Sequence, residues 1–219
     1  STEDTGRKNV AIGYKALHAQ NSDVDNYNVA VGYEAGAAMT TGTMNTLAGG
    51  RAGDAITTGA YNTAFGTDAL SAEDAGSANT AIGALALVQQ DAGADAFNTA
   101  VGYKAGYAVT TAINNTLVGA EAGDAITSGG QNVFIGRSSG GANTIGNSNI
   151  AIGKDALATN VAADRNVAIG HGSLSQMTAA STTDTYNTAV GYLAGTVISS
   201  GVQNVLMGGN AGDALTTGG

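Results

Sequence analysis

The chain repeats a unit of 17 residues along almost its whole length, and this period constrains the fold more than any other feature. Each unit begins with Asn, continues with Thr, Val or Ile, then with a small or apolar and an apolar residue, and reaches Gly at position five. The twelve units begin at Asn9, Asn28, Asn45, Asn62, Asn79, Asn98, Asn115, Asn132, Asn149, Asn166, Asn187 and Asn204. The repetition predicts one array over 1–219 rather than globular domains.

Glycine decides between a helical and a β array. Two units make 34 residues, the length of a helix pair in some helical repeats, but Gly recurs at position five of every unit. An interior Gly costs a helix about 1 kcal/mol relative to Ala, whereas short β-branched runs such as Val10–Ile12 and Thr99–Val101 are typical of strands. The sequence therefore predicts an all-β parallel solenoid, or β-roll, with one coil per unit. At about 4.8 Å per coil, twelve coils would rise about 58 Å.

Within each coil, we expect two short strands and a turn. The first strand runs from the repeat Asn to the Gly, and the representative structural positions are Asn9, Gly13, Asn98, Gly102, Asn187 and Gly191. The second strand covers positions eight to about eleven, as in 52–56, and a Thr-Thr-Gly turn follows at 57–59. Position eight is Ala in ten units and Ser in two, which indicates a close approach of two backbones.

Composition excludes several classes of function. A net charge of −9 leaves no basic face for phosphate, so we expect no nucleic-acid partner. No stretch approaches the ~18 apolar residues of a membrane span, so no membrane insertion is expected in this segment. Residues 1–8 lack the apolar core of a signal peptide, and the array stops in mid-pattern at Gly219, so a longer natural fibre is expected.

The first strand is apolar on both of its faces. Position four is a large apolar residue in eleven units, and position three, on the opposite face, is Ala, Leu or Phe. One face can fill the coil, but a coil of 17 residues has no second layer to cover the other face. We therefore expect neighbouring copies of the chain to cover it, in a parallel homotrimer.

The repeat resembles those of two families of fibrous proteins. Asn-Val-Ala-Ile-Gly at Asn9 and Asn166 is similar to the head repeats of trimeric autotransporter adhesins, and 27–36, 97–106 and 186–195 resemble phage tail-fibre units that read Asn-Thr-Ala-hydrophobic-Gly-Tyr-x-Ala-Gly. The resemblance implies a left-handed parallel β-roll, trimerised about a common axis and used for attachment at a cell or virion surface. The units are longer than typical adhesin-head repeats, so the host system stays open.

These features predict a non-enzymatic structural protein without cofactor, catalytic residue or metal site. The sequence has only two histidines, His18 and His171, and the repeat pattern pairs neither of them with a nucleophilic side chain. The Ala-Gly-Asp-Ala units supply one Asp each, which is too few carboxylates for a calcium-binding β-helix. The alternatives are an ice-binding or a carbohydrate-binding solenoid and, further off, a tailspike-type glycan hydrolase. Tyrosines before the repeat Asn and after the Gly can stack on sugars, although packing against the next coil is the favoured interpretation.

Three insertions break the uniformity of the array and are the candidate recognition loops. They lie within 18–26, 88–96 and 175–185, and in repeat proteins such insertions often map to a binding face. Their candidate contact residues are His18, Asp23, Asp25, Gln89, Asp91, Asp95, Gln176, Thr182 and Asp184. The expected partner is a host cell-surface glycan or protein, and plain variation of loop length is the competing interpretation.

Overall fold

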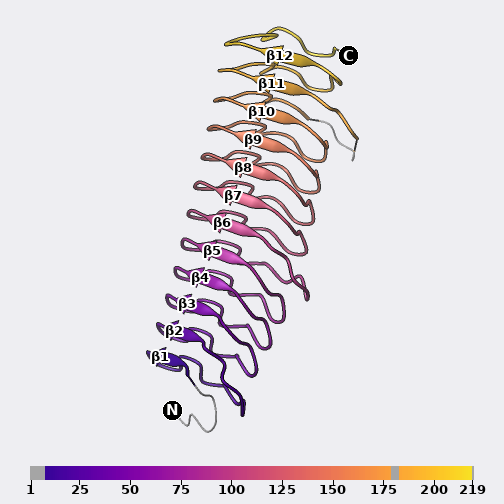
Figure 1. The fold of residues 1–219 in the computed structure, drawn as a ribbon. Helices are drawn as coiled ribbons and strands as arrows, with labels where there is room; N and C mark the ends of the chain where they lie inside the picture. The colour runs from indigo at the N-terminus through magenta and orange to yellow at the C-terminus, as the bar shows by residue number, and fades with distance from the viewer. Residues whose placement is uncertain (1–7, 179–182, 219) are drawn as a thin grey trace.

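A computed structural model, which describes residues 8–178 and 183–218, confirms the parallel β-solenoid (Figure 1). One sheet contains twelve strands of three residues each, stacked in the order of the sequence. They are β1 (Val10–Ile12), β2 (Val29–Val31), β3 (Thr46–Ala48), β4 (Thr63–Phe65), β5 (Thr80–Ile82), β6 (Thr99–Val101), β7 (Thr116–Val118), β8 (Val133–Ile135), β9 (Ile150–Ile152), β10 (Val167–Ile169), β11 (Thr188–Val190) and β12 (Val205–Met207).

Every strand pairs with the next in the register of the repeat. Ala100 of β6 lies opposite Leu117 of β7, and both occupy position three of their coils. The register also survives the insertions, since Val10 lies opposite Val29 across 19 residues and Val167 opposite Thr188 across 21. The insertions therefore leave the register of the strands unchanged. None of the described residues forms a helix of the length and apolarity that crossing a membrane requires.

The second strand predicted for each coil is wrong: positions six to eleven form turns. The residues at positions seven and nine adopt left-handed backbone angles, as at Lys104 (φ 55°) and Gly106 (φ 61°). Two left-handed residues so close together curl the chain and prevent an extended strand. The turns still bond along the stack, because the Gly106 N–H donates to the Ala122 carbonyl at 2.9 Å.

The core is a narrow column inside the stack. The side chain at position three points inward, and Ala100, Leu117 and Phe134 are completely buried. Positions two and four point outward on every strand. Of the two apolar faces of the strand, the one formed by position three therefore fills the coil. The buried Ala or Ser at position eight completes the opposite wall, in agreement with the close approach expected there.

Positions nine and twelve share the remaining core space. Seven coils combine Gly at position nine with a larger residue at position twelve, and a Cβ at Gly123 would lie 2.8 Å from Cδ1 of Ile126. Five coils have Leu at position nine, and in four of these position twelve is polar: Gln20, Glu73, Gln90 and Asn160. Leu at position nine thus mostly occurs with a polar residue at position twelve, and coil ten, with Leu174 and Met177, is the exception. Polar side chains consequently enter the core at defined coils.

The glycine row at position five fixes the contact between successive coils. Gly102 has φ 140°, a conformation that side chains rarely adopt, and a Cβ there would lie 2.5 Å from the carbonyl oxygen of Gly119 in the next coil. The obstacle is backbone, which cannot rotate away as a side chain can. Glycine is therefore required at this position by backbone conformation and by packing at once.

We predict that Gly102→Val lowers the free energy of unfolding by several kcal/mol, because both the backbone strain and the overlap with Gly119 must be relieved by moving a coil. Lys104→Ala, a change on the same turn with the backbone angle retained, should cost about 1 kcal/mol or less. Thermal unfolding followed by circular dichroism compares the two variants. Equal melting temperatures would show that the glycine row has no packing role.

Candidate functional site

The asparagine row is buried and structural. The Asn132 N–H donates to Asn115 Oδ1 at 3.0 Å, and the Asn132 side-chain amide donates to the Gly146 carbonyl at 2.9 Å. The same pair of bonds recurs in most coils, as at Asn45 and Asn149, and there the Asn links its coil to the preceding one and closes its own turn. Asn98 and Asn187 are buried in the same way. The row is structural: its side-chain carbonyls accept backbone N–H groups between coils, its side-chain amides close turns, and the residues of the row from Asn28 to Asn187 are buried.

The outward face of the sheet is uncharged from end to end. Positions two and four of all twelve strands carry only Thr, Val, Ile, Ala, Phe or Met. Ile12 is 59% exposed, Phe65 61% and Val31 38%, while the corresponding residues of β6 to β11 are half-buried. Position two is Thr in five successive coils, β3 to β7. This strip, which we call the strand face, is one candidate interaction surface.

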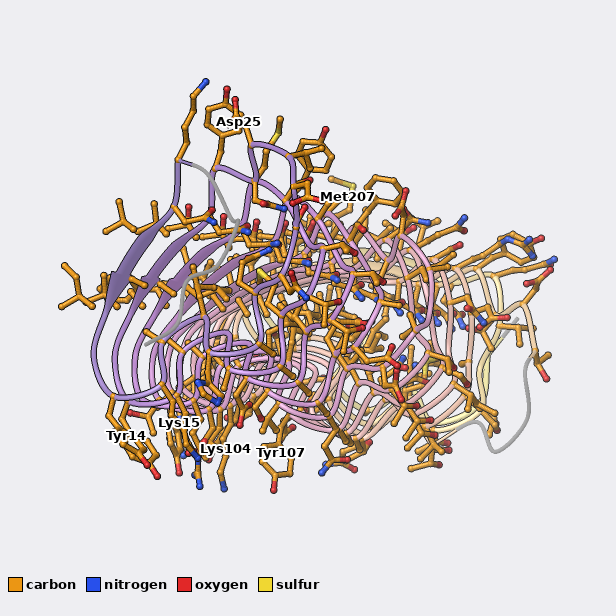
Figure 2. All side chains as sticks on the ribbon, turned by 90° about the horizontal axis from the view of Figure 1, so that it is seen from below. Tyr14, Lys15, Asp25, Lys104, Tyr107 and Met207 are labelled. Atoms are coloured by element: carbon orange, nitrogen blue, oxygen red, sulfur yellow. The ribbon has the colours of Figure 1, made fainter. Side chains whose placement is uncertain are left out.

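Aromatic side chains follow the adjacent corner of the coils. The rings of Tyr14 and Tyr33 stack on each other across two coils with centroids 5.5 Å apart, and His171 stacks on Tyr192 in the same way. Figure 2 shows Tyr14 and Lys104 projecting from the same side of the stack. Packing of a ring against the next coil, the interpretation favoured from the sequence, is confirmed for these two pairs.

Two of the three insertions are held by the same arrangement of side chains. In the first, Asp25 forms an ion pair with Lys8 at 2.7 Å, and Lys8 also contacts the hydroxyl of Tyr27. In the third, Asp184 pairs with Arg165 of the preceding coil and accepts a hydrogen bond from Tyr186 at 3.0 Å. In both loops, the basic residue that precedes the Asn at the start of the coil forms an ion pair with an Asp near the end of the same coil, two residues before a Tyr.

The second insertion has neither the basic residue nor the hydroxyl. Its equivalent positions are Ala78 and Phe97, and Asp95 stands where Asp25 and Asp184 stand in the other two loops. This loop therefore carries acidic charge without the counterion that the repeat provides elsewhere.

The insertions do not converge on one binding site. They belong to coils one, five and ten, and at about 4.8 Å per coil the loops are about 19 and 24 Å apart. Most of the candidate contact residues are exposed, Asp25 is half-buried, and Thr182 lies outside the described residues. The exposed ones are His18, Asp23, Gln89, Asp91, Asp95, Gln176 and Asp184. One chain thus presents three separate loops.

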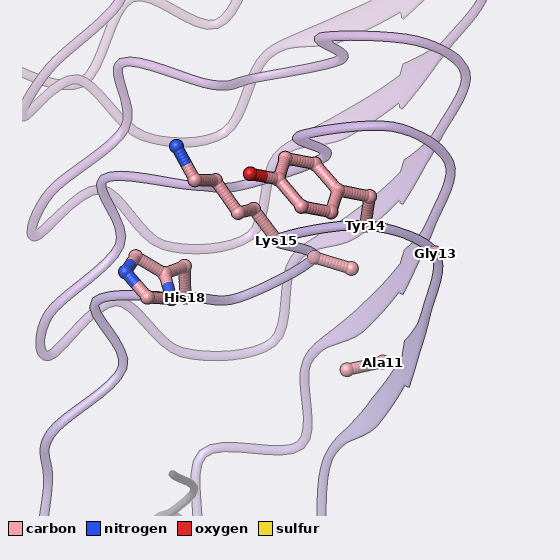
Figure 3. A pocket seen from close by; sticks show the side chains of 6 residues that line it. Ala11, Gly13, Tyr14, Lys15 and His18 are labelled. Carbon is pink, nitrogen blue, oxygen red and sulfur yellow. The ribbon is translucent and has the colours of Figure 1, made fainter. Parts of the chain in front are cut away.

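A shallow hollow of about 430 Å³ lies on the first coil (Figure 3). Ala11, Tyr14, Lys15 and His18 line it. It lies at the first coil of the described residues. Its shape therefore depends on the end of the described chain and carries no functional argument.

Sequence reasoning missed a group of three acidic side chains beside the second insertion. One carboxylate oxygen from each of Glu73, Asp74 and Asp91 lies within 4.8 Å of the others. Asp74 and Asp91 are 17 residues apart and occupy position thirteen of neighbouring coils, so the repeat period itself was the signal that could have found them. Asp54, Asp124 and Asp213 of the Ala-Gly-Asp-Ala units, by contrast, lie four and five coils apart and form no group.

Glu73 is the buried member of this group. Its side chain is completely buried, Oε1 accepts the Gly76 N–H at 2.6 Å, and Oε2 has no hydrogen-bond partner within 8–178 and 183–218. Burial raises the pKa of the Glu73 carboxyl, the backbone N–H groups of Gly76 and Ala92 oppose this rise, and the nearby charges of Asp91 and Asp74 add to it. A buried carboxylate with one unsatisfied oxygen is energetically costly, so this arrangement calls for a physical explanation.

Comparisons of the chain with family models, with curated proteins and with solved structures find no match. The parallel solenoid with its 17-residue period therefore rests on the chain's own structure. The function of the strand face and of the loops has to be argued from their geometry.

Proposed function

We propose that the chain is a structural segment of an extracellular attachment fibre, of the kind found in phage tail fibres or bacterial surface adhesins. Three parallel copies pack about a common axis through their strand faces. The insertion loops then lie on the outside, where they meet a host cell-surface glycan or protein. The role is mechanical and adhesive, without catalysis.

The single observation that carries this proposal is the absence of charge from the whole strand face. Eleven steps of about 4.8 Å make the strip about 53 Å long. Monomeric proteins rarely expose contiguous apolar patches beyond a few hundred Å², and parallel sheets are as a rule covered on both faces. A thin coil can cover only the inner face, so the outer face requires a partner.

A second copy of the chain is the partner that fits best. A surface that repeats with the step of one coil is matched by another surface with the same step, so equivalent coils meet along the full length. Charged side chains are instead found at the corner and in the loops, as in the ion pairs of Arg51 with Asp68 and of Lys15 with Glu34. Closed rotational symmetry about the strand faces would bury the apolar strip and leave these charges in water.

We predict that the unaltered chain sediments with three times the 21.3 kDa mass of one copy and that Val101→Lys sediments as a smaller species. Val101 lies at the middle of the strand face, and an unpaired ammonium buried there would cost several kcal/mol. Tyr103→Lys is the matched control, because Tyr103 is exposed at the corner, and it should remain trimeric. A folded monomer of the unaltered chain would contradict the proposal.

The loops generate a separate prediction. Deleting two residues from each of the first two insertions and four from the third restores units of 17 residues. The trimer should stay folded, because the strand register already ignores the insertions. If the segment binds cells, cell binding measured by flow cytometry should fall, since threefold presentation adds weak contacts through avidity. Undiminished binding by the folded deletion variant would refute recognition by these loops.

The five successive Thr at position two favour ice binding as a second candidate function. Regular hydroxyl and methyl groups on a flat sheet are what such a surface requires, but Phe65 projects beside this row with 61% exposure. A thermal-hysteresis measurement discriminates the two functions. We expect no hysteresis, and hysteresis that is lost on Thr99→Lys would favour ice binding over fibre assembly.

A further inference from the structure

The hydroxyl row at position thirteen is interrupted at the second insertion. Seven coils have Thr there, and the hydroxyls bond along the stack, as from Thr110 Oγ1 to the Thr127 carbonyl at 3.0 Å and from Thr127 Oγ1 to the Thr144 carbonyl at 3.1 Å. Coils four and five have Asp74 and Asp91 instead. An ionised carboxylate cannot donate such a bond, and like charges placed opposite each other on neighbouring strands are destabilising.

Glu73 adds a third carboxylate from inside the column. Position twelve is Met, Ile, Val or Leu in seven coils, whereas here it is Glu, completely buried. One carboxylate oxygen accepts the Gly76 N–H, while Oε2 is buried without a partner. The three side chains each bring an oxygen within 4.8 Å of the others, two from one coil and one from the next.

Protein cations do not neutralise this group. The sequence contains no Lys, Arg or His between Arg51 and Lys104, although it has six acidic residues there: Asp54, Asp68, Glu73, Asp74, Asp91 and Asp95. Arg51 is bound to Asp68 at 2.6 Å, and Lys104 lies over the rings of Tyr103 and Tyr107. The other two insertions each have their own basic residue, so the second is the exception.

We propose that Glu73, Asp74 and Asp91 bind a hard divalent cation of the Ca²⁺ class. Carboxylate oxygens are the ligands that Ca²⁺ prefers, and its flexible coordination tolerates an irregular set completed by water. The cation supplies the positive charge that no Lys, Arg or His between Arg51 and Lys104 can supply. Because Asp74 belongs to coil four and Asp91 to the inserted segment of coil five, the ion joins the two coils and anchors the loop over 88–96.

Isothermal titration of the EDTA-treated, dialysed chain with CaCl₂ tests this site. We expect one site per chain in the unaltered protein, and at least about tenfold weaker binding in Glu73→Gln and in Asp91→Asn, since loss of even an outer-shell partner costs metal sites this much. Asp95→Asn, with the same loss of charge in the same loop, is the matched control and should bind as the unaltered chain does. Equal affinity in all four proteins would overturn the proposal.

Thermal unfolding gives an independent readout. In EDTA, Glu73→Gln should melt at a higher temperature than the unaltered chain, because the amide keeps the acceptor for Gly76 and removes the buried charge. CaCl₂ should raise the melting temperature of the unaltered chain and of Asp95→Asn, but not of Glu73→Gln or Asp91→Asn. No shift with CaCl₂ in the unaltered chain, together with the higher melting temperature of Glu73→Gln, would mean that Glu73 is simply protonated and that no cation site exists.

Discussion

The buried asparagine side chain at the start of each coil is the interaction on which the rest of the structure depends. Its oxygen accepts the N–H of the equivalent Asn in the next coil, and its amide closes the turn of its own coil, as Asn132 and Asn149 do with each other and with Gly146 and Ala163. Two otherwise unsatisfied backbone groups per coil are thereby bonded away from water. The spacing and register of the sheet follow, and the glycine row can then stack backbone on backbone.

This dependence explains where the array tolerates change. Insertions fall after position nine and before the next Asn, so they leave the strand untouched. Their cost appears in the Asn row: among the residues that the structure describes, the buried side-chain nitrogens of Asn9 and Asn79, the first residues of two longer coils, have no hydrogen-bond partner. In these same coils, Gln20 and Gln90 accept hydrogen bonds from the side-chain amides of Asn28 and Asn98, the first residues of the next coils, so a polar side chain from the core partly compensates for the loss.

The sequence allowed the period, the parallel coil and the structural roles of Asn and Gly to be predicted, because each depends on residue type at a fixed spacing. The second strand was predicted wrongly, because the turns that replace it depend on left-handed backbone angles. Residues such as Lys104 and Leu17 adopt these angles in the stack, although their side chains do not favour them. Which side of the strand faces inward was equally hidden, because both sides are apolar. The acidic group needed register as well as composition, since Asp74 and Asp91 meet only when coils are superimposed.

The solenoid thus has three different sides: an uncharged strand face, which we propose is covered by other copies of the chain, a corner of stacked rings and ion pairs, and a loop side with local insertions. Packing of several copies through the strand face is the central claim. The chain has no Cys, so one spin label can be attached through Ile135→Cys on the strand face, with Arg137→Cys at the exposed corner as its control. The account predicts strong dipolar broadening between copies for the label at 135 and little for the label at 137. Sharp, unbroadened spectra at both positions would contradict it.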